Sequence, residues 1–223
     1  MDLNKIDVIY LHGFASSPSS KKAAFFKDQF ARLSIPLTIP DLQEGNFEEL
    51  TISSQIKVVQ STLSSRPGRK FLLIGSSMGG YLAALLGQIN MKVVALYLMA
   101  PGFNFLGRWK KSLKNSSSEP FSFPEYIEVY HYGVDKNVRL NTNIFEDAEV
   151  WEEKSFNRKI PTRIVHGLHD DTVDIGVSRE YVKRQPWCSL EELDSDHSLI
   201  SHIKWIVKDC QNFLEMINEG NFK

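Results

Sequence analysis

Residues 71–86 read FLLIGSSMGGYLAALL, so that a short apolar run, a glycine-bounded pair of serines and a longer apolar run follow one another. The first run has the length and composition of a buried strand, and the second those of a buried helix. The pentapeptide Gly75-Ser76-Ser77-Met78-Gly79 between them fits the pattern G-x-S-x-G. A sharp strand-to-helix turn of this kind strains its central serine, and its two glycines leave room for the turn to close. We therefore predict that Ser77 stands at the tip of a strand as a nucleophile.

The chain on both sides of this turn alternates between strand and helix patterns. Strands such as 93–98 are apolar on both faces, as strands are when helices cover both sides of a sheet. The alternation predicts an α/β fold, with a doubly wound, mainly parallel sheet of about six strands and helices on both faces. The expected strands lie near residues 6–11, 36–40, 70–75, 92–98, 162–166 and 188–193, and the expected helices near 20–33, 48–64, 78–88, 175–184 and 198–216.

The alternation stops for about fifty residues after the fourth expected strand. We interpret residues 103–158 as an inserted cap or lid within a single domain that spans residues 1–223. A chain of 223 residues, 42% of them hydrophobic, can bury one sizeable core. Only two cysteines occur, Cys188 and Cys210, and we expect both to be free, partly buried thiols.

Charge and hydropathy give no support to two classes of partner, nucleic acids and membranes. The formal net charge is −1 and the basic residues are scattered, so charge gives no reason to expect a nucleic-acid partner. No apolar run approaches the roughly 20 residues that a membrane-spanning helix needs, and we expect no stable membrane insertion. A strand that begins at Ile6 leaves no room for a signal peptide, which predicts a cytoplasmic protein.

Two later loops offer the base and the acid that Ser77 needs. A serine hydroxyl is a poor nucleophile until a base within hydrogen-bond reach takes its proton. In this fold class the acid and then the histidine follow the serine along the chain, each on a loop after a late strand. Asp170 lies just beyond the strand at 162–166, and His197 follows the strand at 188–193. We predict that His197 is the base and that Asp170 orients it and stabilises its protonated form.

Two backbone amides are predicted to bind the oxyanion that forms when a serine attacks a carbonyl group. One belongs to Met78, directly after the serine, and the other to Phe14, in the turn after the first strand. His12 and Gly13 precede Phe14 in that turn, and we expect both to lie beside the substrate. The first and third strands of a doubly wound sheet are neighbours where the winding reverses, so this turn should meet the serine.

Other acidic and hydroxyl side chains near these loops leave alternatives. Asp171 and Asp174 remain open as the acid, although each lies farther than Asp170 from the strand tip. Asp196 is expected to shape the turn or to cap the last helix. Ser76 and the serines at positions 16, 17, 19 and 20 are interpreted as loop or capping residues.

The other histidines have structural interpretations. His166 and His169 lie close to Asp170, but ligands spaced this way on a strand and its loop do not share one face, so we expect no metal. His12 is interpreted as shaping its turn rather than as a second base. His131 and His202 are expected at the surface.

These segments together resemble those of the α/β-hydrolases. Within that superfamily the chain is similar to the small bacterial esterases of the YqiA type. Those proteins share a Leu-His-Gly-Phe-x-Ser-Ser-Pro segment, here residues 11–18, and a Gly-Ser-Ser-x-Gly-Gly-Tyr elbow, here residues 75–81. The acid and base segments, residues 166–173 and 195–197, also resemble those of single-domain acyl-protein and acylglycerol hydrolases.

The resemblance covers roughly residues 6–100 and 160–215. It implies hydrolysis of short acyl esters or thioesters without a cofactor, with Ser77, Asp170 and His197 as a catalytic triad. The chain departs from the family in two respects: Asp174 stands where a proline is usual, and the insertion is longer than in the smallest YqiA-like proteins.

The insertion is rich in aromatic residues. A cap of this kind over the serine would exclude water and offer an apolar acyl pocket, in which we expect Phe103 and Trp109 to contact the substrate. The alternative is that the rings only pack the insertion onto the sheet. A loop at residues 116–120 is a candidate hinge. The insertion holds 11 of the chain's 25 aromatic residues: Phe103, Phe105, Trp109, Phe121, Phe123, Tyr126, Tyr130, Tyr132, Phe145, Trp151 and Phe156.

Three classes of function fit these observations. The first is a serine hydrolase, monomeric or homodimeric, that cleaves a small acyl ester or thioester through a Ser77 acyl-enzyme. The second uses the same triad for C–C bond hydrolysis or perhydrolysis, and the third is a binding protein on a hydrolase scaffold. Four basic residues of the insertion either bind an anionic leaving group or form a solvated helix face: Arg108, Lys110, Lys111 and Lys114.

Overall fold

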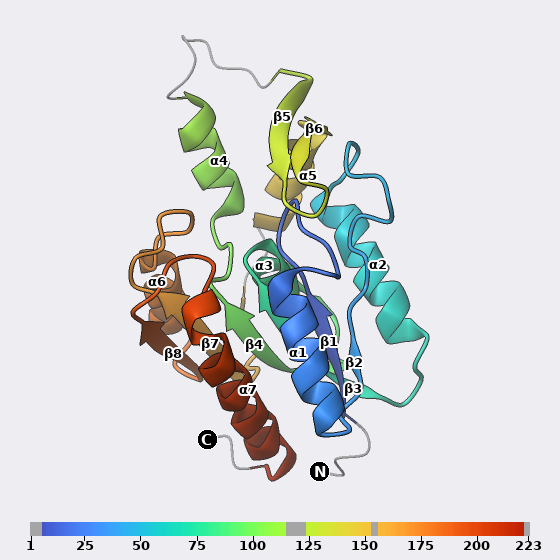
Figure 1. The fold of residues 1–223 in the computed structure, drawn as a ribbon, viewed down its shortest axis with the longest axis vertical. Coiled ribbons are helices and arrows are strands. Elements are labelled where there is room, and N and C mark those ends of the chain that lie inside the picture. Colours follow the sequence, from blue (N-terminus) through green and yellow to red (C-terminus); the bar gives the residue numbers. More distant parts are fainter. Residues whose placement is uncertain (1–5, 115–123, 153–155, 221–223) are drawn as a thin grey trace.

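The structure is a computed structural model that describes residues 6–114, 124–152 and 156–220. In these ranges, six parallel strands form one sheet in the order β2-β1-β3-β4-β7-β8 (Figure 1). Strands β1 and β3 are neighbours and the winding reverses between them, which confirms the predicted doubly wound sheet. The strands are β1 (Ile6–Leu11), β2 (Leu37–Thr38), β3 (Lys70–Ser76), β4 (Val93–Met99), β7 (Thr162–Gly167) and β8 (Cys188–Leu193).

Helices cover both faces of this sheet. Successive side chains of a strand point to opposite faces. Accordingly, Val8 and Tyr10 join a buried cluster with α1 (Lys21–Arg32) and α7 (Ile203–Asn218). Ile9 and Leu11 join the other cluster, with α2 (Ile52–Ser64) and α3 (Met78–Ile89). Helix α6 (Gly176–Arg184) packs against this second cluster too. Because both faces are buried, the central strands β3 and β4 are apolar over most of their length.

Among the described residues, four elements lie between β4 and β7, beyond the carboxyl ends of the strands (Figure 1). They are α4 (Phe105–Lys114), the antiparallel pair β5 (Tyr126–His131) and β6 (Lys136–Asn141), and α5 (Asn143–Glu152). The Tyr132 amide donates to the carbonyl oxygen of Ala15 at 2.8 Å, and the Asn141 amide to that of Glu48 at 2.7 Å. The insertion is therefore tied to the loops that follow β1 and β2.

Local capping decides where two helices begin. Thr51 and Ser54 form a reciprocal capping box, so α2 begins at Ile52 rather than near residue 48 as predicted. Ser20 caps α1 by accepting from the Ala23 amide at 3.4 Å, which confirms one of the predicted capping serines. The final helix is preceded by a short 3-10 turn, η2 (Ile200–His202).

Some predictions need correction or lie outside the described residues. His131 was expected at the surface but is only 4% exposed, because its Nε2 lies 2.9 Å from Gln43 Oε1 and Phe47 packs edge-on against its ring. Both cysteines are free thiols, as predicted, with Cys210 fully buried. The aromatic residues Phe121 and Phe123 and the candidate hinge at 116–120 lie outside the described residues.

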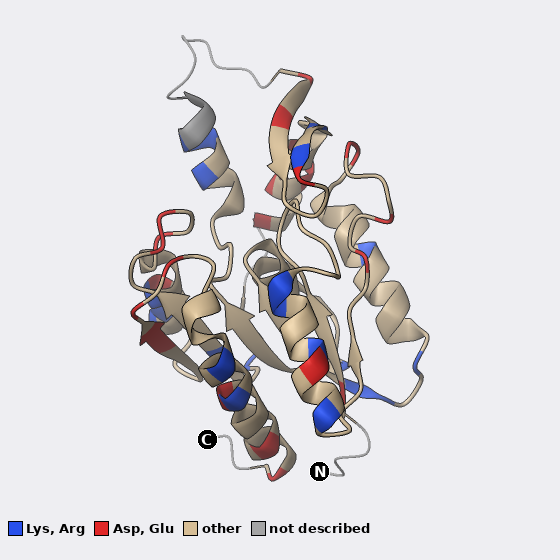
Figure 2. Ribbon diagram, in the orientation of Figure 1, with Lys and Arg blue, Asp and Glu red and all other residues tan. Residues whose placement is uncertain are grey.

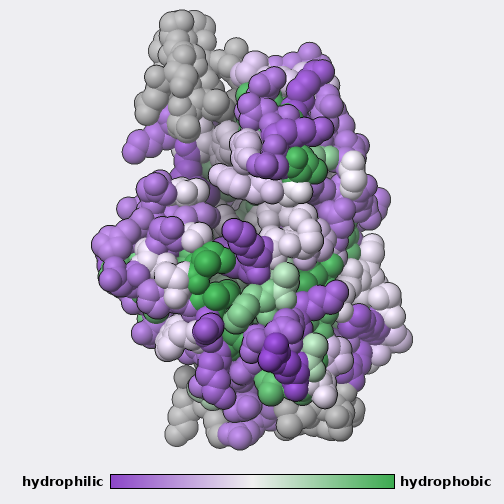
Figure 3. All heavy atoms as spheres, viewed as in Figure 1, coloured by the Kyte–Doolittle hydropathy of each residue, from purple (hydrophilic) through white to green (hydrophobic). Residues whose placement is uncertain are grey.

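Basic and acidic residues are spread over the molecule, and both signs occur together on α1 and α7 (Figure 2). The face formed by α1 and α7 is mostly hydrophilic, with a small hydrophobic patch near the start of α7 (Figure 3). In the described ranges, no helix has the length and apolar character needed to cross a membrane.

Candidate active site

The turn between β3 and α3 holds Ser77 in a strained conformation, with φ 54° and ψ −119°. The chain closes there because two glycines have no side chain. A Cβ on Gly75 would lie 2.3 Å from the carbonyl oxygen of Gly79, and a Cβ on Gly79 would lie 2.2 Å from that of Leu11. The strained serine and its tight turn are thus fixed by backbone contacts.

Ser77, His197 and Asp170 are joined by hydrogen bonds. His197 Nε2 lies 3.1 Å from Ser77 Oγ, and His197 Nδ1 lies 2.7 Å from Asp170 Oδ2. The Asp170 side chain is fully buried, whereas His197 is about one-fifth exposed. A carboxylate that accepts from Nδ1 fixes the tautomer in which Nε2 can take the serine proton.

Asp170 is held by more partners than His197. The amides of Thr172 and Val173 donate to its Oδ1 at 3.0 and 2.7 Å, and Nε2 of the fully buried His166 lies 3.1 Å from Oδ2. Burial alone would raise the pKa of this carboxyl. The hydrogen bonds from His166, His197 and Val173 outweigh burial, so that the pKa lies well below its ordinary value. Asp170 is therefore an anion at neutral pH.

Sequence reasoning missed the role of His166, which it considered only as part of a metal set. The His166 Nε2–H group faces both Asp170 and the Val173 carbonyl oxygen, and Ser178 Oγ lies 2.8 Å from Nδ1. A polar side chain directly after the apolar pair Ile164-Val165, near the end of the strand and four residues before Asp170, was the available signal. In the described ranges, no group of three or more His, Cys, Asp or Glu side chains is arranged as a metal site.

The alternative acids do not contact His197. Asp171 and Asp174 are exposed, and Asp174 Oδ1 accepts instead from the Gly176 amide at 2.7 Å. Asp196 accepts from the amides of Ser198 and Leu199 and so shapes the turn before η2. His169 is exposed and pairs with Asp194.

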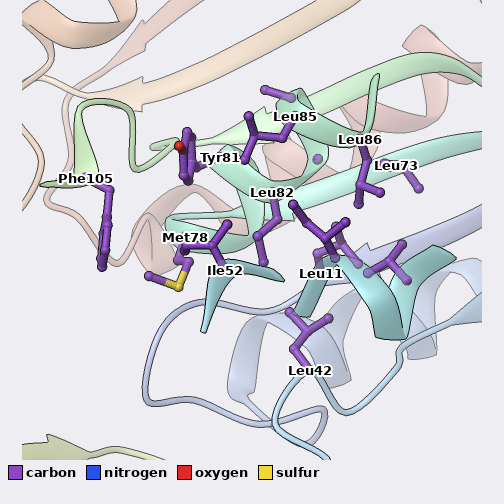
Figure 4. Close-up of a cluster of buried hydrophobic side chains, with 14 of the residues drawn as sticks. Leu11, Leu42, Ile52, Leu73, Met78, Tyr81, Leu82, Leu85, Leu86 and Phe105 are labelled. Atoms are coloured by element: carbon purple, nitrogen blue, oxygen red, sulfur yellow. The ribbon is translucent and has the colours of Figure 1, made fainter. Parts of the chain in front are cut away.

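The amides of Met78 and Phe14 are free to bind an acceptor. Neither has a hydrogen-bond partner within the described part of the chain. Met78 is the first residue of α3, and the first amides of a helix usually lack an intrahelical partner, whereas Phe14 lies in the turn after β1. Met78 and Phe105 lie at one end of the buried cluster around α3 (Figure 4). Gly13 runs beside the serine, since a Cβ on it would lie 3.5 Å from Ser77 Cβ.

A cavity of about 260 Å³ opens at Ser77. One wall comes from loops of the sheet and the other from α4. Trp109, predicted to contact substrate, lines this cavity and packs edge-on against Phe14, with ring centroids 5.8 Å apart. The lining residues are Phe14, Ser77, Met78, Phe105, Arg108, Trp109 and Thr172.

The other three predicted substrate contacts, His12, Gly13 and Phe103, do not line this cavity, although Gly13 runs beside Ser77. Phe103 stacks on Tyr181 at 4.3 Å and lines a separate cavity of about 560 Å³. His12 is 1% exposed, its Nε2 accepts from the Leu42 amide and its Nδ1–H donates to the Gly13 carbonyl oxygen. This geometry matches the interpretation of His12 as a turn-shaping residue, because backbone groups occupy both ring nitrogens.

A comparison with protein families shows to which family the chain belongs. The model of a family described as "Uncharacterised protein family (UPF0227)" matches residues 7–214. The chain belongs to this family. The matched range includes the sheet, the insertion and the three loops that carry Ser77, Asp170 and His197.

One curated relative is the Mycoplasma pneumoniae protein named "Putative esterase/lipase 2". The two sequences are 32% identical over 98 residues, which are 42% of this chain and 37% of the relative. The chain thus matches little more than a third of that protein's length.

Solved structures share the fold over nearly the whole chain. Mouse α/β-hydrolase domain-containing protein 10 superposes with a TM-score of 0.76 at 20% identity, over 95% of this chain and 90% of that one. Est1E from Butyrivibrio proteoclasticus superposes with a TM-score of 0.74 at 16% identity, over 98% of this chain and 90% of that one. At this level of identity the likeness concerns the fold, and it confirms the predicted α/β-hydrolase fold.

Proposed function

We propose that the protein is a serine hydrolase that cleaves carboxylic esters or thioesters through an acyl-enzyme on Ser77. The observation that carries this proposal is the line of hydrogen bonds from Ser77 through His197 to the buried carboxylate of Asp170, at the mouth of a cavity. The name of the Mycoplasma pneumoniae relative also supports ester cleavage. Water and the ester are the only reactants that this chemistry requires.

The proposed reaction has two halves. In the first, Ser77 Oγ attacks the carbonyl carbon while His197 Nε2 takes the hydroxyl proton, and the amides of Met78 and Phe14 bind the oxyanion. His197 then returns the proton to the departing alcohol or thiol, which leaves the acyl group on Ser77. In the second half, water gives a proton to His197 and attacks the acyl carbon; the bond to Ser77 Oγ then breaks, His197 returns the proton to Oγ, and the acid is released. Asp170 stays ionised and stabilises the protonated imidazole in both halves.

The inserted segment serves as the cap of this site within a single domain. Phe105 and Trp109 of α4 form the apolar wall that faces Ser77. A cavity of about 260 Å³ suits a short acyl group better than a long chain. We expect Phe103 to contact the part of the substrate that enters the larger cavity, which Phe103 lines together with Phe156 and Tyr181.

The test is the hydrolysis of p-nitrophenyl esters from acetate to palmitate, with an acyl-thioester in parallel, by the wild-type protein and Ser77→Ala. We expect the short esters to be turned over best and the substitution to lower kcat by at least about 10³-fold. Labelling by a fluorophosphonate probe should occur on the wild-type protein and not on the variant. A protein that neither hydrolyses the series nor takes the label would contradict the proposal, whereas labelling without turnover would point to another reaction of the same triad.

A further inference from the structure

Arg108 is the charged side chain in the wall of the Ser77 cavity. Its Nη2 lies 3.3 Å from the position that a Cβ on Gly102 would take, and the Met78 amide nitrogen lies 3.3 Å from the same position. The guanidinium is therefore within about 7 Å of an amide that is proposed to bind the oxyanion. At this distance, one small molecule can place its reacting carbonyl at the Met78 amide and a second group at Arg108.

Three backbone carbonyl oxygens hold this guanidinium in place. Nε donates to Phe103 at 3.2 Å, Nη1 to Thr172 at 3.2 Å and Nη2 to Gly102 at 3.3 Å. A guanidinium has five N–H groups, so one on Nη1 and one on Nη2 are left over. These two nitrogens form the fork that binds a carboxylate or a phosphate through two parallel hydrogen bonds.

The charge of Arg108 is not matched by an ion pair. No carboxylate of the described ranges lies within 4 Å of its nitrogens, and Asp170 and Glu152 act on it only from farther away. The other residues that line the cavity are neutral at neutral pH. Burial without a partner lowers the pKa of the guanidinium, although the charges of Asp170 and Glu152 raise it. An anion in the cavity would supply the missing partner.

The neighbouring basic residues of α4 have surroundings different from those of Arg108. Lys110 Nζ lies 2.8 Å from Glu149 Oε1 on an exposed surface, and Lys111 is exposed. The side chain of Lys114 lies outside the described residues. The interpretation of these residues as a solvated face fits Lys110, whereas Arg108 faces the site.

We propose that Arg108 binds a carboxylate or phosphate group of the substrate, so that the site selects acyl esters or thioesters with a negative charge close to the scissile bond. This inference rests on the proposed function of Ser77 and narrows its substrate class. The anionic group belongs either to the acyl part or to the leaving group, and both present the same chemistry to the guanidinium. A rival role is purely structural, because the three carbonyl contacts also link the start of α4 to the loop of Asp170.

Two matched pairs of substrates separate these possibilities. p-Nitrophenyl hemisuccinate and p-nitrophenyl butyrate differ in charge on the acyl side, and 4-acetoxybenzoate and 4-acetoxybenzamide differ in charge on the leaving group. We expect the wild-type protein to prefer the anionic member of one pair. Arg108→Gln should then lower kcat/KM for that member by roughly 10-fold to 100-fold, while the neutral member changes by less than about threefold. Arg108→Lys should retain part of the preference.

Lys110→Gln, on the same helix, is the control and should leave both pairs unchanged. An equal loss for charged and neutral substrates in Arg108→Gln would assign the residue to the structural role and overturn the proposal. A wild-type preference for the neutral members would overturn it too. Thermal unfolding of each variant identifies those that fail to fold. If Arg108→Gln fails to fold, Arg108→Lys decides the test, because it should keep only part of the preference for the anionic substrate.

Binding without turnover separates this inference from the proposed function. Calorimetry with monomethyl succinate on Ser77→Ala, and on Ser77→Ala combined with Arg108→Gln, should show binding to the first protein that weakens by roughly 10-fold or more in the second. If no ester is hydrolysed but this difference is found, the anion site stands and the hydrolase proposal fails. If esters are hydrolysed without regard to charge and no difference is found, the anion site fails and the hydrolase proposal stands.

Discussion

The two walls of the Ser77 cavity are held by different kinds of contact. The wall from the sheet is fixed by the backbone, since a Cβ on Gly79 would collide with the carbonyl oxygen of Leu11. The wall from α4 is held mainly by side chains. Trp109 packs against Phe105 and Phe145, with ring centroids 6.2 and 5.4 Å apart.

We propose that the sheet wall governs the reaction itself and that the α4 wall governs which substrate is preferred. Backbone contacts leave the reacting groups almost no freedom, which suits a reaction that needs geometry accurate to a fraction of an ångström. Side-chain packing can change with one substitution and still fill the same space. We therefore expect changes in the sheet wall to affect every substrate alike, and changes in the α4 wall to alter which substrate is preferred.

The largest expected effect lies behind the sheet wall, at Asp170, the proposed acid. Asp170→Asn removes the charge that fixes the tautomer of His197, and we expect kcat for all esters to fall by about four orders of magnitude. Steady-state kinetics on a short and a longer ester checks this. Asp171→Asn, at the exposed neighbour, is the control and should remain close to wild type. A loss confined to one ester would break the proposed division between the two walls.

The same carboxylate should also give stability a pH dependence. Although burial raises the pKa of Asp170, hydrogen bonds from His166 and His197 bring it well below its ordinary value. Such a group stabilises the fold above its unfolded pKa of about 3.9, and this contribution is lost as the pH falls from there through the folded pKa. The difference in unfolding free energy between wild type and Asp170→Asn should thus be constant near neutrality and shrink below about pH 4. Urea unfolding at several pH values measures it, and a difference unchanged down to pH 3 would contradict this account.

The sequence predicted the sheet side of the molecule far better than the insertion. The expected strands at 6–11 and 188–193 have those same bounds in the structure, because turn residues follow each of them directly, His12-Gly13 after the first and Asp194-Ser195 after the second. Ser77, Asp170 and His197 could be selected for the same reason, since each directly follows a strand pattern. The hydrogen bonds then join those three residues.

The contacts of the insertion could not be predicted from local sequence patterns, because the residues that it packs against are remote in the chain. His131 is buried only because Gln43 and Phe47 cover it, and no local pattern reports that contact. Phe103 was expected beside the substrate, and its ring stacks on Tyr181 of α6 and lines the larger cavity instead of the cavity at Ser77. His166 shows the same limit on the sheet side, where Ser178 and Asp170 give its ring a role that spacing alone does not reveal.

His166 offers an intermediate test of the sheet side. His166→Phe removes the donor to Asp170 while keeping a buried ring, and we expect kcat to fall by roughly 10-fold to 100-fold with little change in KM. His166→Gln places a side-chain N–H near the position of Nε2 and should restore most of the loss. Rates on a charged and a neutral ester decide whether the effect is uniform. If Phe and Gln variants lose activity equally while both remain folded, the hydrogen bond to Asp170 is not what His166 contributes.

The smallest effect is expected on the α4 wall, at Trp109. Trp109→Ala removes the ring that packs on Phe14 and enlarges the cavity beside Ser77. Because His197 and Asp170 have their hydrogen-bond partners elsewhere, we expect kcat for acetate to change by no more than a few-fold, while the preferred acyl chain becomes longer. The p-nitrophenyl ester series measures this shift, with Trp109→Phe as a control that keeps an aromatic wall. A uniform loss across the series would mean that α4 helps to hold the reacting groups themselves, and the two walls would then act as one.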